Sequence, residues 1–135
     1  MSGMMKLKDM LGALDPQLGS ERWVFLCLSE PEYLQLQDMA PLATFQEAEG
    51  ITVVVSEAEA LQLGKPVESV FRQVTLQVHS SLDAVGLTAA VSTCLTQAEI
   101  SANVIAAYYH DHIFVPEARA EDALAALLEL KNHSG

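Results

Sequence analysis

Residues 74–116 combine strand, helix and hairpin signals in one uninterrupted run, and this run restricts the possible folds more than any other part of the chain. Apolar and polar side chains alternate across residues 74–79, a period of two that is typical of a strand with one buried face. Directly afterwards, Ser80 and Asp83 have the spacing of a capping-box variant, which satisfies free amide groups in the first turn of a helix. We therefore expect a helix to begin near Leu82.

The helix expected after Leu82 has one apolar stripe and leads into a predicted hairpin. The stripe consists of Leu87, Val91, Cys94, Leu95 and Ala98. A helix with such a stripe buries it against a sheet. Residues 101–108 are rich in β-branched and aromatic side chains, and the three residues that follow His112 are apolar up to Pro116, so two strands joined by a short turn are expected there.

Three short apolar segments in the first half of the chain are also predicted strands. They are residues 23–28, 42–46 and 51–55. The first of them shows no alternation, so we expect it to be buried on both faces. Residues 31–41 carry too little periodicity for an assignment. Residues 67–79 are extended again, and this long stretch is placed to close one sheet and to open a second.

Helices are predicted at three further places. An N-terminal segment has Leu7, Met10, Leu11 and Leu14 on one face. Ser56 and Glu59 form a full S-x-x-E capping box, which starts a short helix that ends at Gly64. A last helix follows Pro116, with Ala120, Ala123, Leu124 and Leu127 on one face.

The predicted elements occur twice in nearly the same order, which indicates an internal duplication without a linker. Residues 1–66 contain the N-terminal helix, three strands and a short helix. Residues 67–135 contain a long strand, a helix, a hairpin and a helix. The order βαββα(β) is typical of the ferredoxin-like α+β fold, in which helices cover one face of an antiparallel sheet. We therefore predict two such halves.

Charge and hydropathy exclude several partners. Seven basic and 18 acidic side chains give a net charge of −11, which repels both nucleic acids and anionic lipid. No apolar run approaches the about 18 residues of a membrane-spanning helix, and the N-terminus lacks a signal-peptide core, so we expect a cytoplasmic protein. Cys27 and Cys94 have no metal-binding spacing, and we expect both to be buried, reduced thiols.

The segment from His79 to Glu117 resembles the ACT domain, a small regulatory βαββαβ module. The resemblance depends on the helix-start Gly86, on Ile100-Ser101 at a strand start, and on the D-x-x-x-V-x-E pattern that begins at Asp111. Within the ACT domains, the chain resembles a bacterial family of tandem ACT-like proteins of unassigned function, and it is similar to the ACT repeats of the CASTOR arginine sensors. Residues 22–29 and 49–60 extend the resemblance into the first half.

This resemblance implies a non-catalytic regulatory module that binds a small effector, usually an amino acid, at an interface between two domains. It implies a homodimer or higher homo-oligomer and no cofactor. The ligand-binding residues that it implies are Val85, Gly86 and Leu87 through backbone groups, Ser101, Asp111, and Ala107 and Tyr108 as the lining of the same cleft.

The chemistry of three of these residues suits an amino acid. Free amides at a helix start favour a carboxylate, and Gly86 in a first helical turn would weaken the helix by about 1 kcal/mol relative to Ala, which is explained if a ligand approaches its backbone. The carboxylate of Asp111 would accept charge-assisted hydrogen bonds from an α-ammonium or a guanidinium. Ser101 would add a neutral hydrogen bond between these two ends.

Each of the three residues also has a purely structural explanation. Gly86 permits close packing of the helix on the sheet, Asp111 favours a turn through its own side chain, and Ser101 is a common residue at the start of a strand. If these explanations hold, the fold is a dimerisation scaffold without a ligand.

A third functional class is a small metal-dependent enzyme that uses the His110-Asp111-His112 turn. An H-x-H pair on a strand places both imidazoles on one side, as in some zinc sites. However, no further ligand motif completes the pair, and no nucleophile with an adjacent base is apparent, so we predict no metal ligand and no catalytic residue. For the neighbouring Tyr108-Tyr109 pair we expect one ring in the core and the other at an interface.

Overall fold

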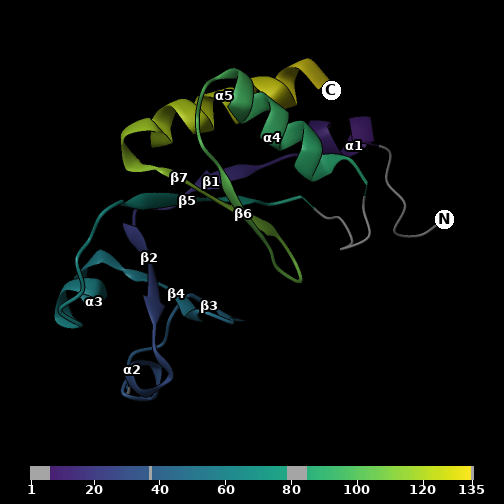
Figure 1. The fold of residues 1–135 in the computed structure, drawn as a ribbon. Coiled ribbons are helices and arrows are strands. Elements are labelled where there is room, and N and C mark those ends of the chain that lie inside the picture. The colour runs from purple at the N-terminus through teal and green to yellow at the C-terminus, as the bar shows by residue number, and fades with distance from the viewer. Residues whose placement is uncertain (1–6, 37, 79–84, 135) are drawn as a thin grey trace. The chain divides into compact units, whose positions relative to one another are not determined.

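The structure, a computed structural model, describes residues 7–36, 38–78 and 85–134 (Figure 1). The chain divides into two compact units. Unit 1 is formed by Met1–Ser20 together with Arg72–Gly135, and unit 2 is formed by Glu21–Phe71. Unit 2 is therefore an insertion in the chain of unit 1.

Unit 1 is a sheet covered by helices on one face. Its elements are α1 (Leu7–Gly12), β1 (Pro16–Leu18), most of β5 (Phe71–Leu76), α4 (Leu87–Gln97), β6 (Asn103–Ala106), β7 (Asp111–Pro116), the 3-10 helix η1 (Glu117–Arg119) and α5 (Ala120–Ser134). The strand order is β1-β5-β7-β6, with β1 antiparallel to β5 and β6 antiparallel to β7. The short β1, which the sequence did not predict, supplies the fourth strand of this sheet.

The core of unit 1 lies between the sheet and its helices. Alternate residues of β5 and β7 are buried there, among them Val74 and Ile113. The predicted apolar stripe of α4 packs against them through Leu87, Val91 and Leu95, and the N-terminal helix adds Met10 and Leu11. These contacts confirm the predicted stripe and explain why α1 covers unit 1: its apolar face would otherwise be exposed to water.

Unit 2 repeats the arrangement on a smaller scale. Its elements are β2 (Trp23–Leu28), α2 (Glu30–Leu34), β3 (Ala43–Glu47), β4 (Gly50–Ser56) and α3 (Glu57–Gln62). The strands β3, β4 and β2 pair antiparallel in that order, and Trp23 of β2 also pairs antiparallel with Phe71. Phe71 thus contributes to the sheet of unit 2, and Val74–Leu76 pair with β1 in unit 1. The ferredoxin-like α+β fold is confirmed. Of the predicted extended stretch 67–79, the strand β5 covers residues 71–76.

The compact units do not coincide with the predicted halves, residues 1–66 and 67–135. The N-terminal helix contacts α4 and α5, and β1 pairs with β5, so the first twenty residues belong to the same unit as the C-terminal half. This grouping depends on pairing between distant segments, which local sequence patterns do not record.

Strand β2 differs from its prediction in burial. Its odd and even residues alternate, with Val24, Leu26 and Leu28 buried and Cys27 exposed, so the expectation that both faces are buried is wrong. The reason is that the helices of unit 2 cover only one side of the sheet. The expectation of a buried thiol is therefore also wrong for Cys27; Cys94 is half-buried, and both cysteines are free.

Helix α2 lies where the sequence allowed no assignment. Ser29 is its N-cap: the Ser29 hydroxyl accepts a hydrogen bond from the Glu32 amide, and the Glu32 carboxylate accepts one from the Ser29 amide. The same capping box was predicted at Ser56 and Glu59, and the structure confirms it at the start of α3.

Candidate functional site

The predicted site begins at the start of α4, where Gly86 is the N-cap rather than a residue of the first turn. Its φ of +95° lies in the left-handed region that favours glycine, and no side chain caps the helix. Helix α4 begins at Leu87, because the left-handed Gly86 cannot continue a right-handed helix. The predicted start near Leu82 and the predicted capping pair, Ser80 and Asp83, lie outside the described residues.

The residues on either side of Gly86 have opposite environments. The side chain of Val85 is 85% exposed, and that of Leu87 is buried in the core of unit 1. The buried Leu87 fixes the helix start on the sheet, while the N-cap residue, Gly86, has no side chain to accept a hydrogen bond from the first-turn amides. Within the described residues, the start of α4 therefore combines a fixed position with the absence of a side-chain cap.

The second part of the predicted site is the turn between β6 and β7. The Ala107 amide donates to the carbonyl of His110 at 3.1 Å, and Ala106 pairs with Asp111. Asp111 is thus the half-buried first residue of β7 rather than a residue of the turn itself. Tyr108 lies in the turn and is exposed.

The two tyrosines of the turn contradict their prediction. Both are exposed, at 76% for Tyr108 and 71% for Tyr109, and their rings meet edge to face with centroids 4.9 Å apart. Neither ring reaches the core, because the turn extends beyond the last pair of the β6–β7 ladder.

Strand alternation places Asp111 on the same sheet face as α4. Asp111 has the same parity as Ile113 and Val115, which both lie in the core beneath the helices. Helix α4 returns the chain to the start of β6, so the β6–β7 turn lies at the end of the sheet where α4 begins, as Figure 1 shows. The structure therefore brings the start of α4 and Asp111 to the same face and the same end of unit 1.

Ser101 lies elsewhere in unit 1. It is exposed and follows the C-terminus of α4, just before β6 begins. The 11 residues of α4 span about 16 Å at the usual helical rise. Within a single chain, Ser101 therefore does not lie next to Gly86. Ala107 and Tyr108, in contrast, lie in the turn beside Asp111.

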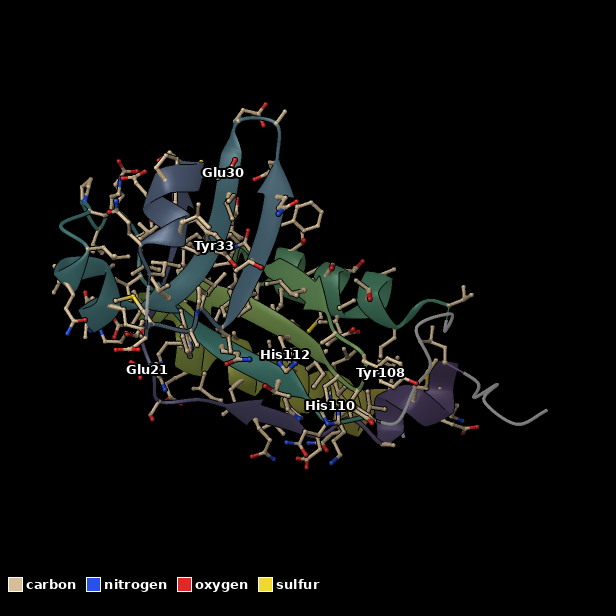
Figure 2. All side chains as sticks on the ribbon, turned by 90° about the horizontal axis from the view of Figure 1, so that it is seen from below. Glu21, Glu30, Tyr33, Tyr108, His110 and His112 are labelled. Atoms are coloured by element: carbon tan, nitrogen blue, oxygen red, sulfur yellow. The ribbon has the colours of Figure 1, made fainter. Side chains whose placement is uncertain are left out.

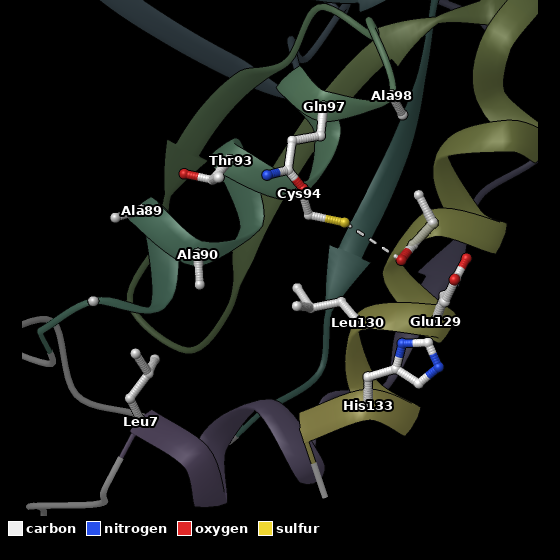
Figure 3. Close-up of a pocket in the computed structure, with 12 residues that line it drawn as sticks. Leu7, Ala89, Ala90, Thr93, Cys94, Gln97, Ala98, Glu129, Leu130 and His133 are labelled. Atoms are coloured by element: carbon white, nitrogen blue, oxygen red, sulfur yellow. Dashed lines mark hydrogen bonds between the residues drawn. The ribbon is translucent and has the colours of Figure 1, made fainter.

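A groove of about 720 Å³ opens next to Gly86 (Figure 3). Its lining residues are Leu7, Gly86, Ala89, Ala90, Thr93, Cys94, Gln97, Ala98, Ala126, Glu129, Leu130 and His133. The Cys94 thiol donates to the Ala126 carbonyl at 3.4 Å, and burial, with a smaller effect of the Glu129 carboxylate, raises the pKa of this thiol. Apart from Gly86, the groove contains none of the predicted ligand-binding residues.

The histidines beside Asp111 are arranged for hydrogen bonding within the sheet. Nδ1 of His112 lies 2.9 Å from Nε2 of Gln73 and 3.0 Å from Oγ1 of Thr75, and Figure 2 shows His110 and His112 near each other. Burial first, and then the neighbouring His110, lower the pKa of His112, while Asp111 opposes this effect. The described ranges contain no group of three or more His, Cys, Asp or Glu side chains that is placed to hold a metal ion.

Two features of this region were missed in the sequence. The absence of a capping side chain at Val85-Gly86 was a readable signal, because neither residue is a good side-chain cap. The contacts of His112 with Gln73 and Thr75 require the pairing of β5 with β7, and only the polar alternation of both strands indicated a shared face.

Comparison with known proteins identifies the class to which this chain belongs. Two profiles, each described as an ACT domain, match residues 2–72 and residues 68–129. The chain therefore belongs to the ACT domain family and contains two ACT domains in tandem. The comparison with curated protein sequences gave no match.

Solved structures extend this assignment. A Vibrio cholerae protein of unknown function, described as a possible transport protein, is 45% identical, with 93% of this chain and 95% of that chain covered and a TM-score of 0.81. The ligand-free regulatory subunit of aspartate kinase from Thermus thermophilus shares the fold at 12% identity, with 87% and 97% covered and a TM-score of 0.68. The corresponding subunit from Thermus flavus is 11% identical, with 87% of this chain and 98% of that chain covered and a TM-score of 0.63. The likeness to CASTOR sensors stays a prediction.

The length and hydropathy of the helices bear on membrane insertion. In the described part of the chain, none is both long and apolar enough to cross a bilayer.

Proposed function

We propose that this protein is a non-catalytic ACT regulatory module that binds an amino acid at the start of α4 in unit 1. The observation that carries the proposal is the uncapped, left-handed start at Gly86, which shares a sheet face and a sheet end with Asp111. Both ends of a zwitterion would thereby meet a complementary group within one small region.

In this proposal the α-carboxylate accepts hydrogen bonds from the backbone of Val85, Gly86 and Leu87, where the helix dipole also favours negative charge. The α-ammonium donates to the carboxylate of Asp111 in a charge-assisted hydrogen bond. Ala107 and Tyr108, in the turn next to Asp111, line the side of the ligand. An arginine would satisfy the same carboxylate through its guanidinium.

The exposed apolar groups at this end of unit 1 favour a protein interface that covers the ligand. Val85 and Tyr108 are both mostly exposed in the single chain, and a second copy that covered them would bury apolar area and close the site. We therefore propose a homodimer with the ligand between its copies, as in the ACT arrangement. Ser101 would then reach the ligand only from the second copy.

The remaining parts of the proposal concern the cell. We propose a cytoplasmic protein without a cofactor, whose net charge of −11 disfavours nucleic acid and membrane surfaces as partners. Its regulatory effect would pass to a separate protein or through its oligomeric state.

A thermal-shift screen of the purified chain against the twenty amino acids tests the proposal. A ligand that binds only the folded state stabilises it by about 2.7 kcal/mol at one hundred times its dissociation constant. We expect a rise in Tm with one amino acid or a few related ones, and Asp111→Asn should strongly reduce it. Glu47→Gln, which removes an acidic group on the hairpin of unit 2, is the matched control.

Absence of a shift with every amino acid would contradict amino acid binding. If the chain remained dimeric in that case, and Asp111→Asn left its assembly unchanged, a ligand-free dimerisation scaffold would be the better account. The metal-dependent enzyme at His110, Asp111 and His112 has no support among the described residues, because no third ligand lies beside this turn.

A further inference from the structure

The sheet of unit 1 carries a hydrogen-bonded group of polar side chains on the face that its helices leave open. His112 of β7 lies against Gln73 and Thr75 of β5, and all three side chains are half-buried. Their positions alternate with the buried Val74 and Ile113, which point to the helices. The proposed ligand site lies on the other face, so this group has no part in it so far.

The hydrogen bonds define the protonation state of His112. The side-chain amide of Gln73 donates from Nε2, so Nδ1 of His112 is an acceptor and the ring proton resides on Nε2. The Thr75 hydroxyl oxygen lies 3.0 Å from the same nitrogen, and a hydroxyl can donate or accept there. An imidazolium carries a proton on both nitrogens and accepts no hydrogen bond. The contact with Gln73 therefore requires neutral His112.

The charges around His112 act in opposite directions. His110 disfavours the imidazolium and Asp111 favours it, while burial, the largest influence, also disfavours it and keeps the pKa of His112 below its ordinary value of 6.5. The neighbours on the adjoining strands, Gln73, Thr75 and Ile105, are uncharged. His112 is thus neutral near pH 7 and becomes charged only at lower pH.

We infer that His112 is a positioning residue for Asp111 and makes effector binding sensitive to pH. The two residues are consecutive at the start of β7, so the contacts of His112 with Gln73 and Thr75 hold this strand start against β5 and fix the carboxylate on the opposite face. Protonation of His112 breaks the contact with Gln73, because two N–H donors then face each other, and this loosens the strand start. This inference rests on the proposed function of Asp111.

The first half of the test needs no effector. In a ¹⁵N NMR titration of the full chain, we expect neutral His112 as the Nε2–H tautomer. The backbone amides of Asp111 and Ala106 should titrate together with its ring. His112→Asn, which keeps an acceptor near the Nδ1 position but takes up no proton, should remove this titration. An Nδ1–H tautomer, or Asp111 and Ala106 amides that ignore the ring, would overturn the inference.

The second half measures the affinity of an amino acid found in the thermal-shift screen across a range of pH. For the wild-type chain, affinity should fall as pH decreases through the pKa of His112. His112→Asn should keep the affinity at neutral pH and lose this dependence. His112→Leu should bind about tenfold more weakly than wild type at neutral pH and show no pH dependence, since it removes both hydrogen bonds. If His112→Leu does not fold, Thr75→Val is measured in its place, because it removes one of the two hydrogen-bond partners of His112.

Gln17→Ala is the matched control, because Gln17 pairs with Thr75 on the same sheet face but has no contact with His112. It should change neither the NMR titration nor the affinity. If wild type and His112→Asn bound the amino acid with the same pH profile, this inference would be overturned, but the proposed function would stand. Binding of no amino acid would instead contradict the proposed function, and the Asp111 titration would then decide whether His112 positions the strand start.

Discussion

Helix α2 of unit 2 and helix α4 of unit 1 begin in different ways. In unit 2, α2 has five residues, and Ser29 and Glu32 satisfy each other's amides in a capping box. In unit 1, α4 has 11 residues and begins at the left-handed Gly86 without a capping side chain. The helix start of unit 2 is therefore closed by side chains of the protein, whereas the N-cap residue of α4, a glycine, has no side chain to offer.

The hairpins differ at the corresponding position. The first residue of the second hairpin strand is Asp111 of β7 in unit 1, where it pairs with Ala106, and Gly50 of β4 in unit 2, where it pairs with Glu47. The two features that suit an amino acid thus occur together in unit 1 and are both absent at the matching places of unit 2. The two copies of the fold thus differ at the two places where we propose the binding site of unit 1.

The largest effect should come from adding a side chain to the hairpin of unit 2. A Cβ at Gly50, which has φ +154°, would lie 2.7 Å from Sγ of Cys27 and 2.8 Å from the carbonyl oxygen of Leu28. Gly50→Ala should lower the free energy of unfolding by about 3 kcal/mol, because the backbone carbonyl cannot move away. Urea unfolding followed by circular dichroism measures it.

Gly64→Ala is the control for backbone conformation. Gly64 has φ +70°, but no atom lies within 4 Å of a Cβ placed there, so only the left-handed strain of about 1 kcal/mol remains. Equal losses for both variants would show that steric exclusion does not explain the glycine at position 50.

The next largest effect concerns the effector. Asp111→Asn removes the charge from the proposed ammonium contact and should weaken binding by about thirtyfold, in the range of a hydrogen bond to a charged group. Isothermal titration calorimetry with the amino acid from the thermal-shift screen measures the change. Unaltered affinity would show that the Asp111 carboxylate does not contact the ligand.

A smaller effect is expected at the closed helix start. Ser29→Ala removes the N-cap of α2 and should destabilise the chain by about 1 kcal/mol, with no change in effector affinity. Ser56→Ala at the start of α3 should behave alike, since it breaks the same kind of capping box. Loss of effector binding in Ser29→Ala would contradict the separation of the two units.

The smallest effect is a pH dependence in unit 2. The hydrogen bond from Lys65, followed by those from Ser29, lowers the pKa of Glu32 from 4.5 to about 2. A lowered carboxyl pKa stabilises the folded state above the unfolded value, so this contribution is complete above pH 4.5 and is lost as the pH falls toward 2. Glu32→Gln should therefore reduce Tm at neutral pH but not near pH 2, where a decrease of equal size would contradict the assignment.

Local patterns predicted much of the fold. The bounds of β2 agree with the predicted residues 23–28, and the S-x-x-E spacing at Ser56 predicted α3. The identical spacing at Ser29 starts α2 although Pro31 follows it, because proline is well tolerated in the first turn of a helix. The short β1 has no pattern of its own and exists through its pairing with β5.

The candidate site was less accessible to sequence reasoning. A spacing such as that of Ser80 and Asp83 suggests a helix start, but the backbone angle that places the start of α4 at Leu87 is not encoded in any motif. The grouping of Asp111 with Gly86 came from the family resemblance, and its physical basis is strand alternation combined with the return path of α4. Ser101 fitted the same resemblance and lies at the other end of that helix.

The most direct test of the account is a ¹⁵N NMR titration of the full chain with the amino acid that the thermal-shift screen identifies. The account predicts saturation at one ligand per chain, with amide shifts concentrated at residues 85–89 and 106–111. Shifts of equal size at residues 29–32 and at Gly50, or saturation at two ligands per chain, would contradict a binding site confined to unit 1.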